Sequence, residues 1–430
     1  MYDSFGFKKN PFNITALRPI ASDAALFVAR KTEINSFLVD ISADDRALVL
    51  ITGFRGVGKT SFASVLQYAV SPIAHPFLDV KVPSADLIPC YHKVQIEPKE
   101  NISNLLFKCV SSLLFSLREF QTLRGTLFPK TLEPLLSWVS NVVPQSGVSG
   151  SMNIAGFGGS FGMVTQYRSV KDIPASALCE QIRQIVVAIN EIGCRGIFLN
   201  LDNLEIVDDW EMARLMDQLR DYLFEIKGLW VTLIGYLGIY SSLTRRVSRV
   251  SEFVSGQETV LDPLKEEDFI EVLRIRRKVF ALNANEIPSL PLEDDFIRKI
   301  YRHTDGEIRA VLKACDDVVR AVFKENPMIK SISEIKGLPF LKQIMRQQLG
   351  LVLLKPKERE ILNEVVRIGS IRPKDYASLS LKSAVDFTNR AKPLLERNLL
   401  RKEIDGVATK YEPSGSVRLA LYAGINLLKD

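Results

Sequence analysis

The stretch GFRGVGKTS, from Gly53 to Ser61, decides the fold of this chain. It follows the apolar run at residues 47–52 and precedes a segment whose apolar residues recur at helical spacing. A strand, a glycine-rich turn and a helix in this order are the context of the G-x-x-x-x-G-K-[ST] phosphate-binding loop. The alternative is a structural glycine turn before a helix. We favour the loop, and therefore expect a nucleoside triphosphate site with ATP as its ligand.

Each residue type in the loop has a chemical reason to be there. The glycines allow left-handed backbone angles, which turn N–H groups toward a phosphate, and the helix start adds further N–H groups. We expect Lys59 to reach the β- and γ-phosphates and the Thr60 hydroxyl to hold Mg²⁺. The residues predicted to bind the nucleotide are Gly53, Arg55, Gly56, Val57, Gly58, Lys59, Thr60 and Ser61.

Length and composition place limits on the rest of the chain. A chain of 430 residues is too long for one hydrophobic core and predicts two to four domains. No apolar run approaches the roughly 18–20 residues of a membrane span, and the N-terminus lacks a secretory pattern, so we expect a cytoplasmic protein without membrane contact. Five cysteines and three histidines are scattered, which argues against zinc and against a disulfide framework.

Two motifs ahead of the phosphate loop carry a family resemblance. They are FGFKKNPF at residues 5–12 and LFVARKTEI at residues 26–34. The chain here resembles AAA+ ATPases of the origin-recognition (replication-initiator) and transposition-regulator groups, which carry F-G-…-N-P-F and F-[VT]-G-R-x-x-E. The resemblance implies that Arg30 and Glu33 shape the adenine pocket, although Ala29 stands where the family prefers glycine.

The resemblance also implies a domain layout. Residues 1–262 would form an α/β P-loop NTPase domain with a parallel sheet and helices on both faces, including a second buried strand at residues 88–96. Residues 263–350 would form the α-helical AAA+ lid and its linker, and residues 351–430 a winged helix. Residues 121–172 look inserted and contain a glycine-rich stretch at 146–164. We interpret that stretch as a flexible β-hairpin. Hairpins in AAA+ proteins often touch DNA or a partner, but we favour the alternative of a packed or partly disordered insertion.

A further apolar strand ends in Asp202, which we expect to hold Mg²⁺ through water. An active AAA+ enzyme usually has glutamate immediately after this aspartate, whereas this chain has Asn203 and then Glu205. The run resembles the D-D-L-[DE] ending of signalling ATPases of the STAND group. Either Glu205 serves as the catalytic base, or hydrolysis is slow and the nucleotide acts as a switch.

Two arginines are predicted to complete the site by resemblance. Arg249 lies in TRRVSRVSEF, where initiator-type ATPases place an arginine that acts on the ATP of a neighbouring subunit, which would imply an oligomer. A solvated basic helix end is the alternative. Arg309 lies in TDGEIR, which resembles the second sensor motif of the lid. A surface arginine in a helix's first turn is disfavoured because a cation there opposes the helix dipole.

The last 80 residues have the layout of a winged helix. Three predicted helices precede a hairpin at residues 399–412, with a turn at Asp405-Gly406. From Leu351 to Asp430 there are 15 Lys/Arg and 10 Asp/Glu, a net charge of +5, which is typical of a module that faces nucleic acid, although a bland solvated surface is the alternative. The residues predicted to contact duplex DNA are Lys382, Asn389, Arg390, Arg401 and Lys402.

Two hypotheses of function follow. The first is an AAA+ switch ATPase that couples its nucleotide state to DNA binding or assembly through the winged helix. The second is a signalling or defence ATPase that controls a partner effector protein, with the winged helix docking protein. Both predict ATP hydrolysis that is slow and switch-like, with Asp202, Glu205 and Arg249 as the catalytic set.

Overall fold

The computed structural model describes residues 1–42, 44–73, 86–142, 173–204, 207, 209–350, 354–405 and 408–425. The chain divides into two compact units. The sheet unit, as we name it, comprises residues 16–53 and 59–261, and the helical unit comprises residues 1–15, 54–58 and 262–430. Within the described ranges, no helix is both long and apolar enough to cross a bilayer.

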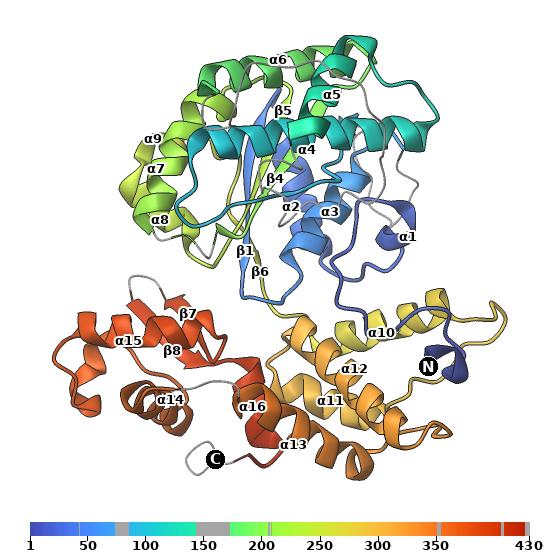
Figure 1. The fold of residues 1–430 in the computed structure, drawn as a ribbon, viewed down its shortest axis with the longest axis vertical. Coiled ribbons are helices and arrows are strands. Elements are labelled where there is room, and N and C mark those ends of the chain that lie inside the picture. The colour runs from blue at the N-terminus through green and yellow to red at the C-terminus, as the bar shows by residue number, and fades with distance from the viewer. Residues whose placement is uncertain are drawn as a thin grey trace. The chain divides into compact units, whose positions relative to one another are not determined.

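A six-stranded parallel sheet forms the centre of the sheet unit (Figure 1). The strand order is β2-β4-β5-β1-β6, with β3 also paired to β4. The strands are β1 (Ala47–Gly53), β2 (Leu87–Ile88), β3 (Val94–Gln95), β4 (Gly196–Asp202), β5 (Leu229–Ile234) and β6 (Thr259–Leu261). Because all pairs are parallel, the carboxyl ends of β1 and β4 lie at the same edge, where such sheets bind ligands.

Helices cover both faces of this sheet, as the sequence predicts. The helices of this unit are α1 (Ala21–Ala24), α2 (Lys31–Ser42), α3 (Lys59–Ala69), α4 (Ile102–Arg124), α5 (Glu133–Val142), α6 (Ala175–Glu191), α7 (Asp209–Leu219), α8 (Ile239–Arg246) and α9 (Ser248–Ser251), with a short 3-10 helix η2 (Lys130–Leu132) and a π-helical segment η6 (Arg220–Phe224).

The two faces follow from alternation along the strands. Leu199 of β4 packs in the large core that α4 and α6 share. Its neighbour Phe198 points the other way, where it stacks on Phe37 of α2. On β5, Trp230 also faces α2 and donates its indole N–H to the Ile41 carbonyl at 3.2 Å. Every residue of β4 is buried, as expected of a strand covered on both sides.

The strand predicted at residues 88–96 is interrupted, which corrects that expectation. Pro89 has no N–H to donate, and the next N–H groups bond to side chains instead of to a strand. Cys90 N donates to Gln67 Oε1 at 3.1 Å, and the N–H groups of Tyr91 and His92 both donate to Ser116 Oγ. The chain therefore enters β3 from a short loop that α3 and α4 hold in place.

Four helices of the helical unit follow the sheet in sequence, α10 (Glu266–Phe280), α11 (Asp294–His303), α12 (Ile308–Glu325) and α13 (Glu334–Gly350). The N-terminal residues belong to this unit: η1 (Tyr2–Phe5) leads to Phe7, which pairs with Ala281. Buried Arg276 of α10 fixes the N-P-F motif, because its guanidinium donates to the carbonyls of Pro11 and Asn13 at 3.1 and 2.8 Å.

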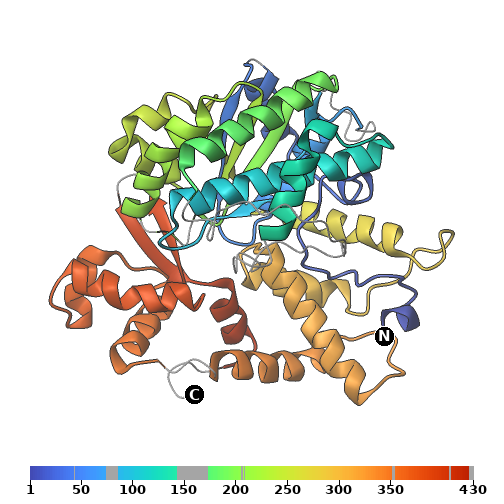
Figure 2. The ribbon, with the colours of Figure 1, turned by 45° about the horizontal axis from the view of Figure 1, so that its top comes forward.

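The C-terminal part of this unit has the winged-helix layout (Figures 1 and 2). Its elements are α14 (Pro356–Ile368), η7 (Pro373–Leu379), α15 (Ala384–Glu396), the hairpin β7 (Leu400–Asp405) and β8 (Ala408–Pro413), and α16 (Gly415–Tyr422). Phe387 of α15 is fully buried against Tyr411 of β8, with ring centroids 5.2 Å apart. The register pairs Asp405 with Ala408, and residues 406 and 407 lie outside the described residues.

One of the divisions between the units falls between Leu261 and Asp262, and the domain bounds predicted from the sequence stay predictions. The lid (263–350) and the winged helix (351–430) share one unit with residues 1–15, so their separation into two domains stays a prediction. Residues 121–142 of the predicted insertion form the end of α4, η2 and α5. The predicted hairpin at 146–164 lies outside the described residues.

A buried polar network joins α3 to the sheet. Gln67 Nε2 donates to Asn200 Oδ1 at 2.5 Å and to Thr232 Oγ1 at 3.3 Å, while its carbonyl oxygen accepts the Cys90 N–H. Gln67 and Thr232 are fully buried, and Asn200 is 1% exposed. The network fixes the helix after the phosphate loop against the strand that ends in Asp202.

Replacing Gln67 with leucine should lower the free energy of unfolding by about 1–3 kcal/mol, because the Asn200 amide and the Cys90 N–H lose buried partners. Urea unfolding followed by tryptophan fluorescence measures the change. Gln184→Leu, on the exposed surface of α6, is the control and should stay within about 0.5 kcal/mol of the parent. A loss no larger than the control's would contradict a stabilising network.

Candidate nucleotide site

The phosphate loop adopts the backbone that its glycines allow. Gly53, Gly56 and Gly58 have φ angles of 143°, 85° and 98°, between the end of β1 and the start of α3 at Lys59. A Cβ added at Gly58 would meet nothing within 4 Å, so backbone conformation, not space, requires glycine there. The first turn of α3 supplies N–H groups without helical partners, as a phosphate site needs.

The other loop residues are placed as follows. The Lys59 side chain folds back over the loop, where Nζ donates to the Gly53 carbonyl at 3.0 Å. Arg55 is exposed and Val57 is buried. Ser61 Oγ accepts the Leu17 N–H at 3.1 Å, which ties the segment before the adenine motif to the start of α3.

Asp202 lies at the carboxyl end of β4 with only 7% of its side chain exposed. Its Oδ2 accepts a hydrogen bond from Thr60 Oγ1 at 3.1 Å and lies 2.7 Å from Lys93 Nζ. Its Oδ1 accepts the Asn203 N–H at 2.9 Å. The structure thus brings together Thr60 and Asp202, the two residues predicted to hold Mg²⁺. It adds Lys93, which no sequence motif indicates.

These residues fit a magnesium ion of the kind that nucleotides carry. Mg²⁺ prefers oxygen ligands and is usually held by one or two carboxylates together with substrate phosphates. Thr60 and Asp202 supply one hydroxyl and one carboxylate in contact. The described residues contain no cluster of three or more His, Cys, Asp or Glu that could hold a metal ion, so the ion would need the phosphates as further ligands.

Asn203 has a left-handed backbone, with φ of 69°. Asparagine tolerates this conformation better than most residues. Its side chain cannot accept a proton as glutamate would, so it cannot serve as a general base. Glu205 lies outside the described residues, and its role as the base stays a prediction.

The adenine motif contains two successive left-handed residues, Ala29 and Arg30, with φ of 64° and 63°. Glycine adopts this conformation without strain, which explains the family's preference at position 29. The Arg30 side chain is only 6% exposed and lies 3.6 Å from Glu33 across the start of α2. Arg30 is therefore a packed residue, and its contribution to an adenine pocket stays a prediction.

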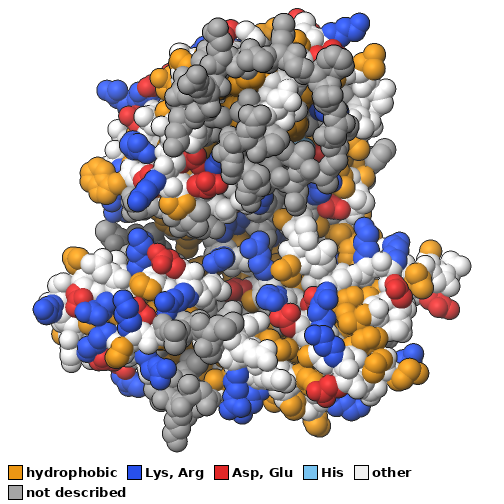
Figure 3. Space-filling view, viewed as in Figure 1, with side chains coloured by type: hydrophobic (Ala, Val, Ile, Leu, Met, Phe, Trp, Pro, Cys, Tyr) orange, Lys and Arg blue, Asp and Glu red, His pale blue; other side chains and the backbone are white. Residues whose placement is uncertain are grey.

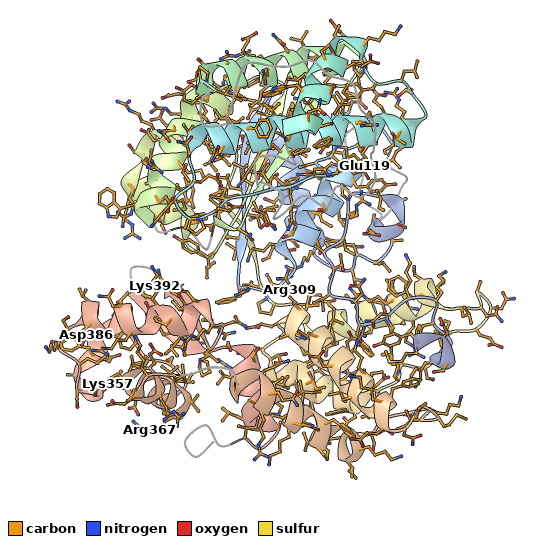
Figure 4. The ribbon with its side chains drawn as sticks, in the orientation of Figure 1. Glu119, Arg309, Lys357, Arg367, Asp386 and Lys392 are labelled. Atoms are coloured by element: carbon orange, nitrogen blue, oxygen red, sulfur yellow. The ribbon has the colours of Figure 1, made fainter. Side chains whose placement is uncertain are left out.

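The two predicted arginines lie in different units. Arg249 is exposed on the short helix α9. Arg309 is exposed at the first turn of α12 (Figure 4), and its N–H lies 3.4 Å from the Gly56 carbonyl within the helical unit. A Cβ added at Gly56 would lie 3.6 Å from Arg309 Cβ, so the second-sensor turn sits against residues 54–58 of the loop.

The predicted DNA residues differ in what surrounds them. Lys382, Asn389 and Lys402 are exposed. Arg390 pairs with Asp386 one turn away, at 2.8 Å. Arg401 is 18% exposed and engaged with carboxylates inside the helical unit, so a DNA contact would require it to leave them.

Sequence reasoning missed a further basic residue on α15. Val385, Thr388, Asn389 and Lys392 are all exposed, at the spacing of one helical face. Figure 4 shows Lys392 on the side of α15 away from Lys357 and Arg367 of α14, and Figure 3 shows lysine and arginine side chains gathered over this part of the unit. Lys392 lies three residues after Asn389, so the spacing of one helical face would have found it.

Replacing Lys59 with alanine should weaken ATP binding by at least about tenfold, since a cation near the phosphates is lost from a poorly solvated site. Titration with a fluorescent ATP analogue measures the affinity. Lys227→Met removes one positive charge at an exposed ion pair of the same unit and should leave the affinity within about twofold. Unchanged affinity in Lys59→Ala would overturn the assignment of the loop.

Comparison with known proteins bears on the fold. No family model matches the sequence. An uncharacterised HTH-type transcriptional regulator of Methanocaldococcus jannaschii is 19% identical over 428 residues, covering 96% of this chain and 91% of that protein. The Aeropyrum pernix ORC2 protein, solved as ADPNP-ADP complexes, has a TM-score of 0.50 at 12% identity, with 97% of each chain covered. The ORC1 protein of the same organism, solved with DNA, has a TM-score of 0.49 at 11% identity, over 99% of this chain and 97% of that one. The chain has the AAA+ P-loop fold of the origin-recognition proteins.

Proposed function

We propose that this chain is an ATP-binding switch that couples its nucleotide state to DNA binding through the winged helix. The observation that carries the proposal is a network of ion pairs between the second-sensor turn, residues 304–309, and the wing, which is the hairpin of β7 and β8. The second-sensor turn, residues 54–58 of the phosphate loop and the winged helix all lie in one compact unit.

The nucleotide end of the switch uses residues already in place. Lys59 and the N–H groups at the start of α3 would bind the phosphates, while Thr60 and Asp202 would hold Mg²⁺. When bound, Mg²⁺ would offset the negative charge on the β- and γ-phosphates. Because Asn203 stands where a base is expected, we propose that hydrolysis is slow, with Glu205 as the candidate base and Arg249 of a neighbouring subunit as the candidate finger.

The network centres on Arg401 of β7 and Glu412 of β8. Arg401 bonds Glu412 at 2.6 Å and reaches Asp305 of the turn at 3.0 Å. Arg418 of α16 contacts the same two carboxylates, Asp305 at 2.5 Å and Glu412 at 3.2 Å. Burial acts to raise the pKa of Glu412, but hydrogen bonds from Lys410 and Arg401 outweigh burial and hold the pKa below its ordinary value. The carboxylate is therefore charged at neutral pH.

A second contact links the same parts without ion pairing. Glu307 of the turn is buried, and its Oε1 accepts the N–H of Gly415, which begins α16, at 3.2 Å. A Cβ at position 415 would lie 2.9 Å from the Glu307 carboxyl, so only glycine allows this approach. The Arg401 guanidinium also lies over the Phe54 ring of the phosphate loop, 5.0 Å from its centroid. Movement of the turn or loop on nucleotide binding would therefore be transmitted to the wing.

The DNA end of the switch is proposed for the exposed face of α15. Asn389 and Lys392 of α15, with Lys382 just before the helix, present two cations and an amide. The cations suit contact with phosphates and the amide suits contact with base edges. Lys402 of β7 is also exposed and is a further candidate for phosphate contact. The relative described as an HTH-type transcriptional regulator, which spans nearly the whole chain, supports a DNA-facing helix.

A second candidate is a signalling ATPase whose winged helix docks a partner effector. One observation favours it: Val385, on the same exposed face of α15, is 68% exposed. An apolar side chain on such a face suits protein contact at least as well as DNA contact. DNA binding by the intact chain separates the two candidates.

Asp305→Asn should uncouple nucleotide state from DNA affinity. Asparagine keeps the shape and suits the left-handed backbone at 305, where φ is 50°, but it removes the charge that Arg401 and Arg418 share. Fluorescence anisotropy with duplex DNA should show that ATP and ADP states of the parent differ by about five- to 150-fold in affinity, and that the variant brings this ratio close to one.

The matched control is Asp317→Asn, which breaks an ion pair with Lys313 on α12, away from the turn. It should preserve the ratio. A ratio unchanged by Asp305→Asn, with the parent responsive to nucleotide, would contradict transmission through this network.

Neutralising Lys382 and Lys392 together should weaken DNA binding at every sequence and make it less sensitive to salt. The slope of log K against log salt concentration should fall by about 0.9 for each phosphate that the variant no longer neutralises. Arg367→Ala, which removes a cation paired with Glu364 on α14, is the control and should not change the slope. If the parent chain shows no salt-dependent DNA binding, the protein-docking candidate is favoured.

A further inference from the structure

Lys93 makes the closest charged contact of Asp202 among the described residues. Its Nζ lies 2.7 Å from Asp202 Oδ2, the same oxygen that accepts the Thr60 hydroxyl. The Asp202 side chain is 7% exposed and that of Lys93 is 35% exposed. The carboxylate therefore has a cation beside it that is part of the chain.

The loop before β3 fixes the backbone that carries Lys93. The N–H groups of Tyr91 and His92 both bond Ser116 of α4, and His92 Nε2 lies 3.1 Å from Glu119 of the same helix. Lys93 follows directly, and the register of β3 sets Gln95 opposite Asp202. The long flexible part of the Lys93 side chain is thus the only portion that must move for Nζ to leave Asp202.

We infer that Lys93 is an internal counter-ion that compensates Asp202 in the absence of Mg²⁺ and competes with Mg²⁺ for the same carboxylate oxygen. The inference rests on the proposed function, because it takes Asp202 as the residue that holds Mg²⁺. A buried carboxylate without a cation is costly, so one must be present in each state. An ammonium and a divalent ion at one oxygen would repel each other strongly.

The consequence is a threshold for Mg²⁺. Binding of Mg²⁺ with the nucleotide must displace Lys93 from Asp202. Breaking that ion pair makes the free energy of Mg²⁺ binding less favourable, so the affinity for Mg²⁺ falls. The displaced ammonium belongs to a side chain that is already 35% exposed, so it can be solvated by water. Lys93 therefore sets how much Mg²⁺ the nucleotide-bound state requires.

A purely structural ion pair makes a different prediction. If Lys93 only stabilised the loop before β3, its removal would destabilise the chain with and without ligand, and Mg²⁺ would bind equally well or more weakly. Competition instead predicts that removing the Lys93 charge has two effects of opposite sign. Without Mg²⁺ the chain becomes less stable, whereas with nucleotide present its affinity for Mg²⁺ rises.

Lys93→Met, which keeps the length of the side chain without its charge, tests this. We expect the melting temperature without ligand to fall by a few degrees. In a Mg²⁺ titration at fixed fluorescent ATP analogue, we expect half-saturation at a Mg²⁺ concentration roughly fivefold lower than in the parent, as expected for loss of one competing ion pair. Lys93→Arg retains the charge and should behave as the parent does.

Lys227→Met, which removes the cation of an exposed ion pair elsewhere in the sheet unit, controls for net charge and should shift neither quantity. Unchanged or weaker Mg²⁺ dependence in Lys93→Met, with a parent that binds the analogue, would overturn the inference and leave the proposed function standing. A parent that shows no Mg²⁺-dependent binding of the analogue would instead overturn the proposed function, and the inference with it.

Discussion

The burial of one carboxylate, that of Asp202, is the constraint on which the sheet unit depends. It ends a strand with helices on both faces, where an uncompensated charge would cost several kilocalories per mole. The chain surrounds it with a hydroxyl, an ammonium and a backbone N–H, from Thr60, Lys93 and Asn203. These three groups come from α3, from the loop before β3 and from the turn after β4. The position of each of these segments is therefore tied to one pair of oxygens.

The same segments are held from behind by an uncharged network. Gln67, two turns along α3 from Thr60, contacts Asn200 of β4 and Thr232 of β5, and binds the N–H of Cys90 in the loop that leads to Lys93. Buried amides of this kind rigidify a core only when their partners are satisfied. Stability and ligand geometry are consequently coupled here, because what holds α3 against β4 also holds Thr60 against Asp202.

Sequence predicted the fold well because its signals are local. Continuous apolar runs gave β1, β4 and β5, and glycine spacing placed the phosphate loop between β1 and α3. The interruption of the 88–96 strand was missed because it depends on Ser116, which lies in α4 and becomes a neighbour only after folding. Lys93 was missed for the same reason, since nothing in its own stretch of sequence indicates an aspartate more than a hundred residues away. The sequence showed that Asn203 and Ala29 depart from the family pattern, but it did not show that both have a left-handed backbone.

In the winged helix, a count of charged residues indicates a basic surface but does not show which residues form it. Arg401, Lys410 and Arg418 contribute to the basic excess of the last 80 residues, yet Glu412 or Asp305 contacts each of them. A cation that already has a buried carboxylate gains less from a phosphate, because the first pair must be broken. These three cations are therefore engaged within the helical unit, whereas Lys382, Lys392 and Lys402 are exposed. Since these contacts also involve the second-sensor turn, the segment that would read the nucleotide is the one that holds the wing.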